Sequence, residues 1–251
     1  MGKEYEFKIH MNRKQAEEVI RKMLRQNDIM PHSAKTKIDK YWCANEMYNT
    51  VRPNEIKDVV RLRTTNKISE TEITAIGKAD SYNDNLINWF FYDTEKYKEF
   101  LKDVEMPLDN VKYYATYKNK NIADGHESNE ECEERISPEL FSIIRRCYDS
   151  LGTLYFNKVK RCICPFICKE GHLNEGTINV DIDNVNDLYY FEIEFVPYVE
   201  GVYPEDMIYE GLEKVAKEFG LDPKNKDPRS WIEITTEAAR ARQSFKDHKR
   251  K

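Results

Sequence analysis

The chain has 251 residues, of which 40% are hydrophobic and 34% are charged, and its formal net charge is −5. This length fits one large domain or one domain with a sizeable insertion, and the apolar share is sufficient for a core. The small net charge argues against a general nucleic-acid-binding protein, because such proteins are usually basic, so any site for a polyanion must be local.

Residues that alternate between apolar and polar predict strands, and apolar residues three and four positions apart predict helices. In chain order, the clearest predicted strands are residues 3–9, 37–43, 58–64, 111–117, 131–136, 154–164, 177–183 and 190–196. Helices are predicted at residues 14–25, 94–104, 138–152 and 204–219. Two weaker patterns, at residues 73–78 and 89–92, suggest further strands. Few strand pairs are joined by helices, which favours an antiparallel α+β fold over a parallel sheet.

The sequence contains no apolar run long enough to span a bilayer, and its first residues lack the apolar core of a signal peptide. We therefore expect a cytoplasmic protein with no membrane partner and with reduced cysteines. Cys162, Cys164 and Cys168 lie close together and His172 follows, but this spacing is not a familiar zinc pattern. Ordinary thiols in strands and turns are the preferred interpretation, and a metal site is the minor alternative.

The most informative feature is the type of residue at alternate strand positions. Residues two apart lie on the same face of a strand. On seven predicted strands one face carries charges, while mostly apolar and often aromatic residues occupy the other. Many of the charges form like-sign pairs, namely Glu4 with Glu6, Arg61 with Arg63, Glu131 with Glu133, Lys158 with Lys160, Asp181 with Asp183, and Glu192 with Glu194.

Two arrangements explain these charged faces. In the first, the charged face of a sheet is simply exposed to water. In the second, the sheet closes into a barrel with the charges inside, and helices cover its apolar outer face. Like-sign pairs need counter-charges nearby, which favours the closed barrel. Inside such a barrel, carboxylates would hold divalent cations, and Arg and Lys side chains would hold phosphate oxygens.

These residues resemble the motifs of the triphosphate tunnel metalloenzymes, also called the CYTH family after class IV adenylyl cyclases and thiamine triphosphatases. Eight motifs follow the family's order from Lys3 to about Ile234. One motif alone would carry little weight, whereas eight in order are specific. They are Glu4-Tyr5-Glu6-Phe7-Lys8, Asp39-Lys40-Tyr41, Arg61-Leu62-Arg63, Thr116-Tyr117-Lys118, Glu131-Cys132-Glu133, Lys158-Val159-Lys160, the block of Asp183-Asn184-Val185 and Glu192-Ile193-Glu194, and Ser230-Trp231-Ile232-Glu233.

The resemblance implies a closed eight-stranded antiparallel β-barrel with amphipathic helices outside, and a tunnel that binds a triphosphate with Mg²⁺ or Mn²⁺. It also implies roles for residues in this chain. The expected catalytic residues are Glu4, Glu6 and Lys8. The expected phosphate-binding residues are Lys8, Arg61, Arg63, Lys118, Lys158 and Lys160. The expected metal ligands are Glu4, Glu6, Glu133, Asp183, Glu192 and Glu194.

The chain departs from the family pattern at two places that affect the site. Residues 66–107 separate the Arg-x-Arg motif from the Thr-Tyr-Lys motif, and either Lys78 or Lys118 would then face the tunnel. Lys160 stands where the family has arginine, and a one-residue slip of register would turn Arg161 inward instead. We interpret residues 66–107 as an insertion outside the barrel. The tunnel domain then spans residues 1–236, and the basic residues 237–251 form a flexible tail.

A tunnel of this kind supports several activities. Hydrolysis of a nucleoside triphosphate, inorganic tripolyphosphate or thiamine triphosphate is preferred, because it needs only a bound triphosphate and water. Attack by a ribose 3′-hydroxyl on the α-phosphorus would instead make the chain an adenylyl cyclase that forms cyclic AMP and pyrophosphate. Cleavage of the 5′-triphosphate of RNA is a third alternative, and it is the one role for nucleic acid that we retain. A non-catalytic module that binds polyphosphate or nucleotides is the fourth, although clustered carboxylates argue against it.

Two further expectations concern single features. His10 continues the charged face of the first strand, where a polar residue at the rim of the barrel is the preferred interpretation and a general base is the alternative. The insertion offers surface for a lid, for part of a substrate pocket or for the contact of a homodimer. The small-molecule triphosphate is the main expected partner.

Overall fold

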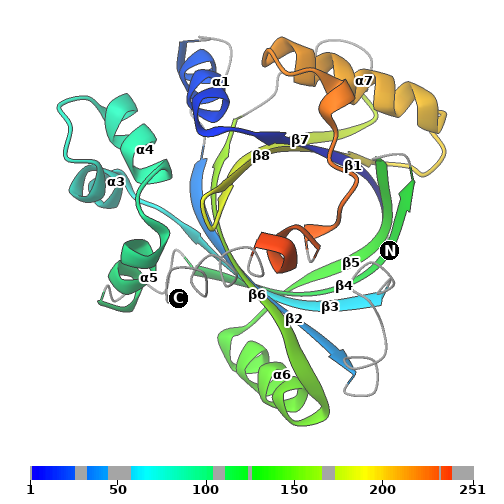
Figure 1. Cartoon of the computed structure of the whole chain (residues 1–251). Helices are drawn as coiled ribbons and strands as arrows, with labels where there is room; N and C mark the ends of the chain where they lie inside the picture. Colours follow the sequence, from blue (N-terminus) through cyan, green and yellow to red (C-terminus); the bar gives the residue numbers. More distant parts are fainter. Residues whose placement is uncertain are drawn as a thin grey trace, which may run out of the picture.

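The alternation of charged and apolar residues produces strands that close into a barrel, as Figure 1 shows for the computed structural model. The structure describes residues 2–25, 33–44, 58–103, 111–123, 126–165, 173–231 and 233–238. The strands are β1 (Gly2–Met11), β2 (Ser33–Ala44), β3 (Asp58–Lys67), β4 (Val111–Ala123), β5 (His126–Ile136), β6 (Gly152–Cys164), β7 (Gly176–Val185) and β8 (Leu188–Pro197). Neighbouring strands follow the order β1-β5-β4-β3-β2-β6-β7-β8, all pairs are antiparallel, and β8 pairs with β1. The predicted fold class, a closed eight-stranded antiparallel barrel of the α+β class, is confirmed.

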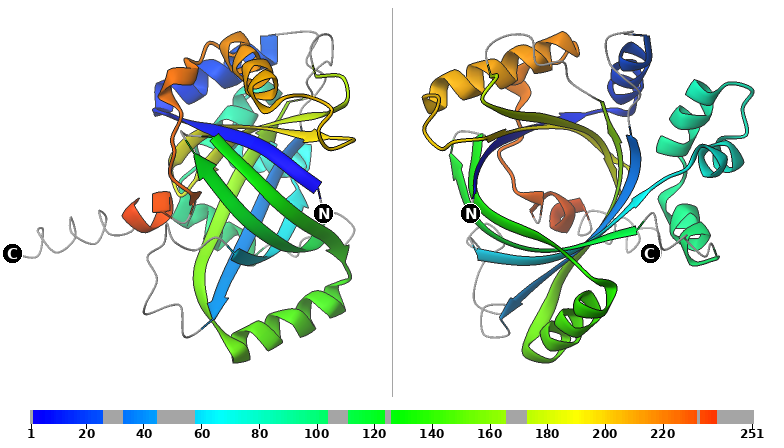
Figure 2. Two further views of the ribbon diagram at one scale, coloured as in Figure 1. Left: turned by 90° about the vertical axis from the view of Figure 1, so that its right-hand side faces the viewer. Right: turned by 180° about the vertical axis from the view of Figure 1, so that it is seen from behind.

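Apart from the helical residues that follow Ser230, the helices lie outside the barrel (Figures 1 and 2). They are α1 (Arg13–Arg25), α3 (Glu70–Gly77), α4 (Tyr82–Phe90), α5 (Thr94–Asp103), α6 (Pro138–Leu151), α7 (Glu205–Glu218) and the short 3-10 helix η3 (Pro223–Asn225). Helices α1 and α7 cover the wall made by β1, β7 and β8, whereas α6 packs near β4 and β6. Among the described residues, none of the helices combines the length and apolarity that a membrane crossing requires.

The main hydrophobic core lies between the barrel wall and the helices. On β1, Tyr5, Phe7 and Ile9 point outward and are buried under this helical layer. The ring of Tyr5 meets that of Tyr209 on α7 edge to face, with 6.0 Å between the centroids. Apolar side chains thus lose water on the outside of the barrel, where the hydrophobic effect stabilises the packing of helices on strands. The inner face is left to the charged residues.

The segment between β3 and β4 forms helices, so the strands suggested at residues 73–78 and 89–92 are wrong. Ser69 begins α3, because its hydroxyl accepts a hydrogen bond from the backbone N–H of Glu72 and the Glu72 carboxylate accepts one from the backbone N–H of Ser69. This reciprocal cap was visible in the sequence as Ser-x-x-Glu. Residues 89–92 span the end of α4, where tertiary packing outweighs the strand propensity of four aromatic residues.

Arg161 connects these helices to the barrel wall by hydrogen bonds. It points outward from β6, and its guanidinium donates hydrogen bonds to the Trp89 carbonyl oxygen at 3.0 Å and to Thr94 Oγ1 at 2.9 Å. Thr94 in turn donates to Asp187 in the turn between β7 and β8. The guanidinium also lies 5.0 Å from the centroid of the Tyr97 ring. Because Lys160 points inward, the register slip that would have turned Arg161 into the tunnel does not occur.

The chain after α7 crosses one end of the barrel. The backbone N–H of Asp227 donates to the carbonyl oxygen of Lys8 at 2.8 Å, and the Tyr190 hydroxyl donates to the Asp227 carboxylate at 2.8 Å. The following helical residues, coloured red, lie within the outline of the barrel when it is viewed along its axis (Figures 1 and 2). This segment brings Trp231 into the interior. Residues 239–251, which include most of the predicted tail, lie outside the described residues.

The role of Arg161 leads to a stability prediction. Arg161→Met should lower the free energy of unfolding by about 2–4 kcal/mol, because it leaves the buried Trp89 carbonyl and Thr94 hydroxyl without their donor. Urea denaturation followed by circular dichroism measures this change. Arg146→Met, at an exposed position on α6, is the matched control and should change stability by less than about 0.5 kcal/mol. Equal unfolding midpoints for the two variants would contradict the role given to Arg161.

Candidate functional site

The barrel encloses a cavity of about 340 Å³ whose lining is mostly charged. Among the described residues, seven basic and eight acidic side chains line it. The basic residues are Lys35, Lys37, Arg61, Arg63, Lys118, Lys158 and Lys160. The acidic residues are Glu4, Glu6, Glu127, Glu131, Glu133, Asp181, Glu192 and Glu194. The nearly equal numbers mean that most of these charges can be paired inside the barrel.

Three of the acidic residues converge at one wall. Glu4 and Glu6 come from β1 and Glu194 from β8, and each offers a carboxylate oxygen within 4.8 Å of the other two. Glu6 and Glu194 are direct cross-strand partners, which fixes this arrangement. Burial raises the pKa of Glu4 to about 9 and the pKa of Glu6 to about 8, and nearby carboxylates add to both shifts. The group, here called the carboxylate triad, has the oxygen ligands that Mg²⁺ and Mn²⁺ prefer.

Lys118 supplies a positive charge next to the carboxylate triad. Its Nζ lies 3.6 Å from Glu4, 3.3 Å from Glu6 and 3.3 Å from Glu131. Burial would lower the pKa of Lys118, but Glu6 and Glu131 outweigh burial and raise the pKa well above its ordinary value. Lys118 therefore stays charged. The competing candidate, Lys78, is an exposed residue at the C-terminal cap of α3 and lies outside the cavity lining.

Two arginines on β3 form the basic part of the opposite wall. Arg63 donates to both oxygens of Asp39, from Nε at 2.7 Å and from Nη2 at 3.1 Å. Arg61 donates to Glu131 at 2.9 Å and to Glu133 at 2.7 Å. Burial opposes the charged form of Asp39, but the nearby guanidinium of Arg63 and the ammonium of Lys158 hold its pKa well below the ordinary value. Both arginines are thus held in place by ionised carboxylates.

Two lysines on β6 lie beneath an aromatic ring. Lys158 Nζ lies 3.2 Å from Asp39, and Lys160 Nζ contacts Asp183 and Glu192. The Trp231 ring centroid is 4.8 Å from Lys158 Nζ and 5.5 Å from Lys160 Nζ, so the ring faces both ammonium groups. The indole N–H of Trp231 also donates to Glu192 at 3.1 Å. Trp231 therefore fixes one end of the basic wall.

The structure brings most of the predicted site residues together. Ten of them line the cavity, and two, Lys8 and Asp183, are buried without being part of its lining. Lys8 forms an ion pair with Glu127 at 3.5 Å, whereas Asp183 forms one with Lys160. The ten are Glu4, Glu6, Arg61, Arg63, Lys118, Glu133, Lys158, Lys160, Glu192 and Glu194.

Sequence reasoning missed several charged residues that line the cavity. Lys35 and Lys37 share the inward face of β2 with Asp39 and Tyr41, and they follow the same period-two alternation that identified the other strands. Glu127 on β5 shows the same signal. Glu131 and Asp181 also line the cavity; the sequence placed both on charged strand faces, but neither received a role. Lys35 and Glu127 were missed because the predicted strands began at residues 37 and 131, whereas β2 begins at Ser33 and β5 at His126.

The remaining candidates lie elsewhere. His10 is exposed, with its ring centroid 5.1 Å from that of Tyr190, and it is outside the cavity lining. Cys162 and Cys164 are on β6, but Cys168 and His172 lie outside the described residues. The four-residue Cys and His pattern is therefore visible only in part.

No family model matches the sequence, and comparison with curated proteins also gives no match. Solved structures are similar in fold. A protein of Pyrococcus horikoshii OT3 superimposes with a TM-score of 0.60 at 16% identity, over 94% of this chain and 99% of that one. A Pyrococcus furiosus protein gives 0.51 at 18% identity, over 92% and 98% of the two chains. A Vibrio parahaemolyticus protein, described as a candidate adenylate cyclase, gives 0.51 at 13% identity, over 93% and 97%.

These similarities extend over nearly the whole length of both chains in each pair. The matching structures share the fold, while identities of 13–18% leave the chemistry to be argued from the residues themselves. The barrel closes with the charged motifs inside, in the order that the sequence motifs require. The chain therefore has the closed tunnel fold of the CYTH family, the triphosphate tunnel metalloenzymes, which its motifs resemble.

Proposed function

We propose that the chain is a divalent-metal-dependent phosphohydrolase that acts on a triphosphate. The observation that carries this proposal is that the carboxylate triad and a wall of fixed cations face the same cavity. Carboxylates suit a hard divalent cation, and guanidinium and ammonium groups suit phosphate oxygens. A linear chain of phosphates bridges two such walls, because it binds metal on one side and basic side chains on the other.

The donor chemistry of the carboxylate triad fits Mg²⁺ or Mn²⁺. Its three carboxylates are close enough to share one ion, and burial disfavours their charged forms while they have no cation between them. When bound, the metal would orient a phosphate oxygen and offset charge on the attacking or leaving oxygen. Glu4, Glu6 and Glu194 would hold it, and Glu133 and Glu192 line the same cavity.

The charge of the cavity supports metal dependence. Its acidic side chains outnumber its basic side chains by one, so the described lining has no excess of positive charge to offer a triphosphate when every carboxylate is ionised. A polyanion that entered alone would face buried carboxylates, and this interaction is unfavourable in a site of low dielectric constant. A cation held by the carboxylate triad would remove that repulsion. Binding of substrate and metal should therefore depend on each other.

The basic residues would position the phosphate chain. Asp39 holds Arg63 and Lys158 side by side and leaves further N–H donors on both side chains. Arg61 is fixed in the same way by Glu131 and Glu133. Cations that are already oriented lose little entropy when they bind phosphate, which favours catalysis by positioning. Attack by water on the terminal phosphorus then requires only the bound triphosphate, whereas cyclisation also requires a ribose hydroxyl of the substrate.

Cyclisation is the second candidate, and a separate observation favours it. Tyr41, Tyr114 and Trp231 line the same cavity as the cations, and aromatic rings can contact a nucleobase. The Vibrio parahaemolyticus protein of the same fold is described as a candidate adenylate cyclase. Incubation with ATP, tripolyphosphate, thiamine triphosphate and a 5′-triphosphate RNA, followed by product identification, separates the alternatives. Orthophosphate supports hydrolysis, cyclic AMP with pyrophosphate supports cyclisation, and no metal-dependent product from any of them contradicts both.

The carboxylate triad leads to a prediction about metal. Glu6→Gln should lower metal-dependent turnover by on the order of a hundredfold or more, because it removes a ligand. Mn²⁺ should raise the Tm of the unchanged protein and have little effect on that of the variant. Without metal, the variant should be as stable as the parent or more so, since one buried carboxylate is removed.

The matched control for this prediction is Glu134→Gln, which changes an exposed glutamate on the outer face of β5. It should keep both turnover and the response of Tm to Mn²⁺. Full turnover in Glu6→Gln, or an equal Tm increase with Mn²⁺ in both variants, would exclude the carboxylate triad as the metal site.

The basic wall leads to a prediction about substrate binding. Arg63→Lys should raise KM for the triphosphate by roughly tenfold or more. The planar guanidinium of arginine can donate to Asp39 and to a phosphate at once, whereas the single ammonium of lysine cannot reproduce both interactions. Steady-state kinetics measures this change in KM. The control is Arg146→Lys, on the exposed surface of α6, which should leave KM unchanged. An unchanged KM and kcat in Arg63→Lys would contradict direct phosphate contact.

A further inference from the structure

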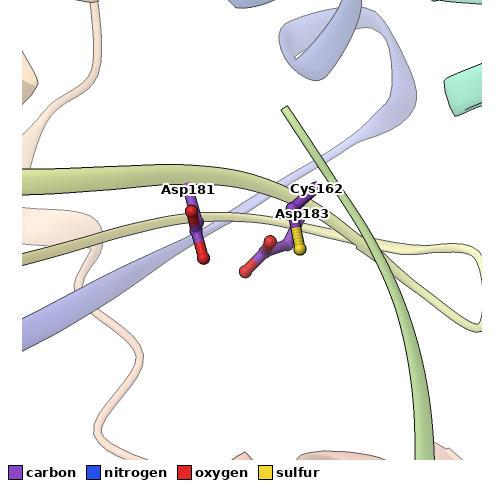
Figure 3. A group of neighbouring side chains, drawn as sticks. All are labelled: Cys162, Asp181 and Asp183. Atoms are coloured by element: carbon purple, nitrogen blue, oxygen red, sulfur yellow. The ribbon is translucent and has the colours of Figure 1, made fainter. Parts of the chain in front are cut away.

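A second group of metal-binding donors lies on the barrel wall formed by β6 and β7. Cys162 and Asp183 are direct cross-strand partners, and Asp181 lies two residues before Asp183 on the same face. The sulfur of Cys162 and one oxygen from each aspartate all lie within 4.8 Å of one another. Figure 3 shows the three side chains pointing to the same side of their strands. None of them belongs to the carboxylate triad.

The ligand atoms of this group are not fully used in hydrogen bonds. Cys162 and Asp183 are both 0% exposed. Asp183 Oδ1 has no hydrogen-bond partner among the described residues, whereas Oδ2 lies against Lys160 Nζ. The Cys162 thiol donates a long hydrogen bond, 4.0 Å, to the Lys160 carbonyl oxygen. A buried carboxylate oxygen without a donor is unfavourable, and a bound cation would satisfy it.

The charges around the group leave room for a divalent ion. When all three carboxylates are ionised, Asp181, Asp183 and Glu192 carry three negative charges, and the Nζ groups of Lys37 and Lys160 that contact them carry two positive charges. With a neutral thiol, this set has one excess negative charge. A divalent cation that binds while the Cys162 thiol releases its proton to solvent brings the set to neutrality. Asp183 can offer Oδ1 to the metal and keep Oδ2 on Lys160.

We propose that Cys162, Asp181 and Asp183 form a binding site for a thiophilic divalent cation of the Zn²⁺ class, separate from the carboxylate triad. A thiolate ligand favours Zn²⁺ and Cd²⁺ over Mg²⁺, which prefers oxygen alone. One sulfur and two carboxylate oxygens are three of the four ligands of a tetrahedral site, and water completes it. The ion would lie beside Lys160, a residue of the basic wall, so its binding would alter the charge that a phosphate meets there.

Titration with Cd²⁺ tests this site in the full chain without any triphosphate. Excess Mg²⁺ is present throughout, so that the carboxylate triad is occupied by a hard cation. Formation of the Cd²⁺–thiolate bond produces an ultraviolet charge-transfer band. The unchanged protein should show a saturable band together with release of protons. Cys162→Ser should lose that band and bind Cd²⁺ at least about tenfold more weakly.

Two controls make the outcome specific. Cys147→Ser, on the exposed face of α6, and Cys164→Ser, two residues along β6, should keep the band. Asp183→Asn should weaken Cd²⁺ binding while the thiol remains, and it provides the test if Cys162→Ser does not fold. Retention of the band in Cys162→Ser, its loss in Cys164→Ser, or unchanged Cd²⁺ affinity in Asp183→Asn would overturn the proposal. Because the measurement uses no substrate, it is independent of the proposed triphosphatase activity.

Discussion

Pairing of opposite charges inside a closed barrel is the constraint on which the rest of this structure depends. An isolated charge that is buried away from water is strongly destabilising, so each inward carboxylate or cation needs a partner. Asp39 illustrates the solution, because it holds both Arg63 and Lys158. Lys118 does the same for acidic residues from two strands. The paired inward charges therefore determine the chemistry of the interior.

This constraint places the hydrophobic core outside the barrel. Since the inner face is charged, the apolar residues of the same strands can lose water only under helices. Phe7 and Phe195, which are almost fully buried, are examples on β1 and β8. The helices between β3 and β4 extend the same layer, and Arg161 joins them to β6 by hydrogen bonds. Binding chemistry is thus assigned to the inner face of each strand, and most hydrophobic packing to the outer face.

The period of two made much of this organisation predictable from sequence. A strand residue and its neighbour two positions on must share a face, so Glu4, Glu6, Arg61 and Arg63 could be assigned to one interior without coordinates. Pairings across strands could not be assigned, because register is set by contacts between distant parts of the chain. The pairing of Cys162 with Asp183 is one such case. Short apolar runs such as residues 73–78 fit either a helix or a strand, and only the cap at Ser69 favours the helix.

The pairing of the first strand with the last has a consequence for how the chain acquires its structure. β1 hydrogen-bonds to β5 on one side and to β8 on the other, so the ring cannot close until the segment that contains β8 has been synthesised. Contacts between residues so far apart in sequence form slowly, since a long loop must be closed first. Until then, the charges of an open sheet remain in contact with water. Closure of the ring, and with it the removal of these charges from water, therefore requires β8, which also brings the acidic residues Glu192 and Glu194.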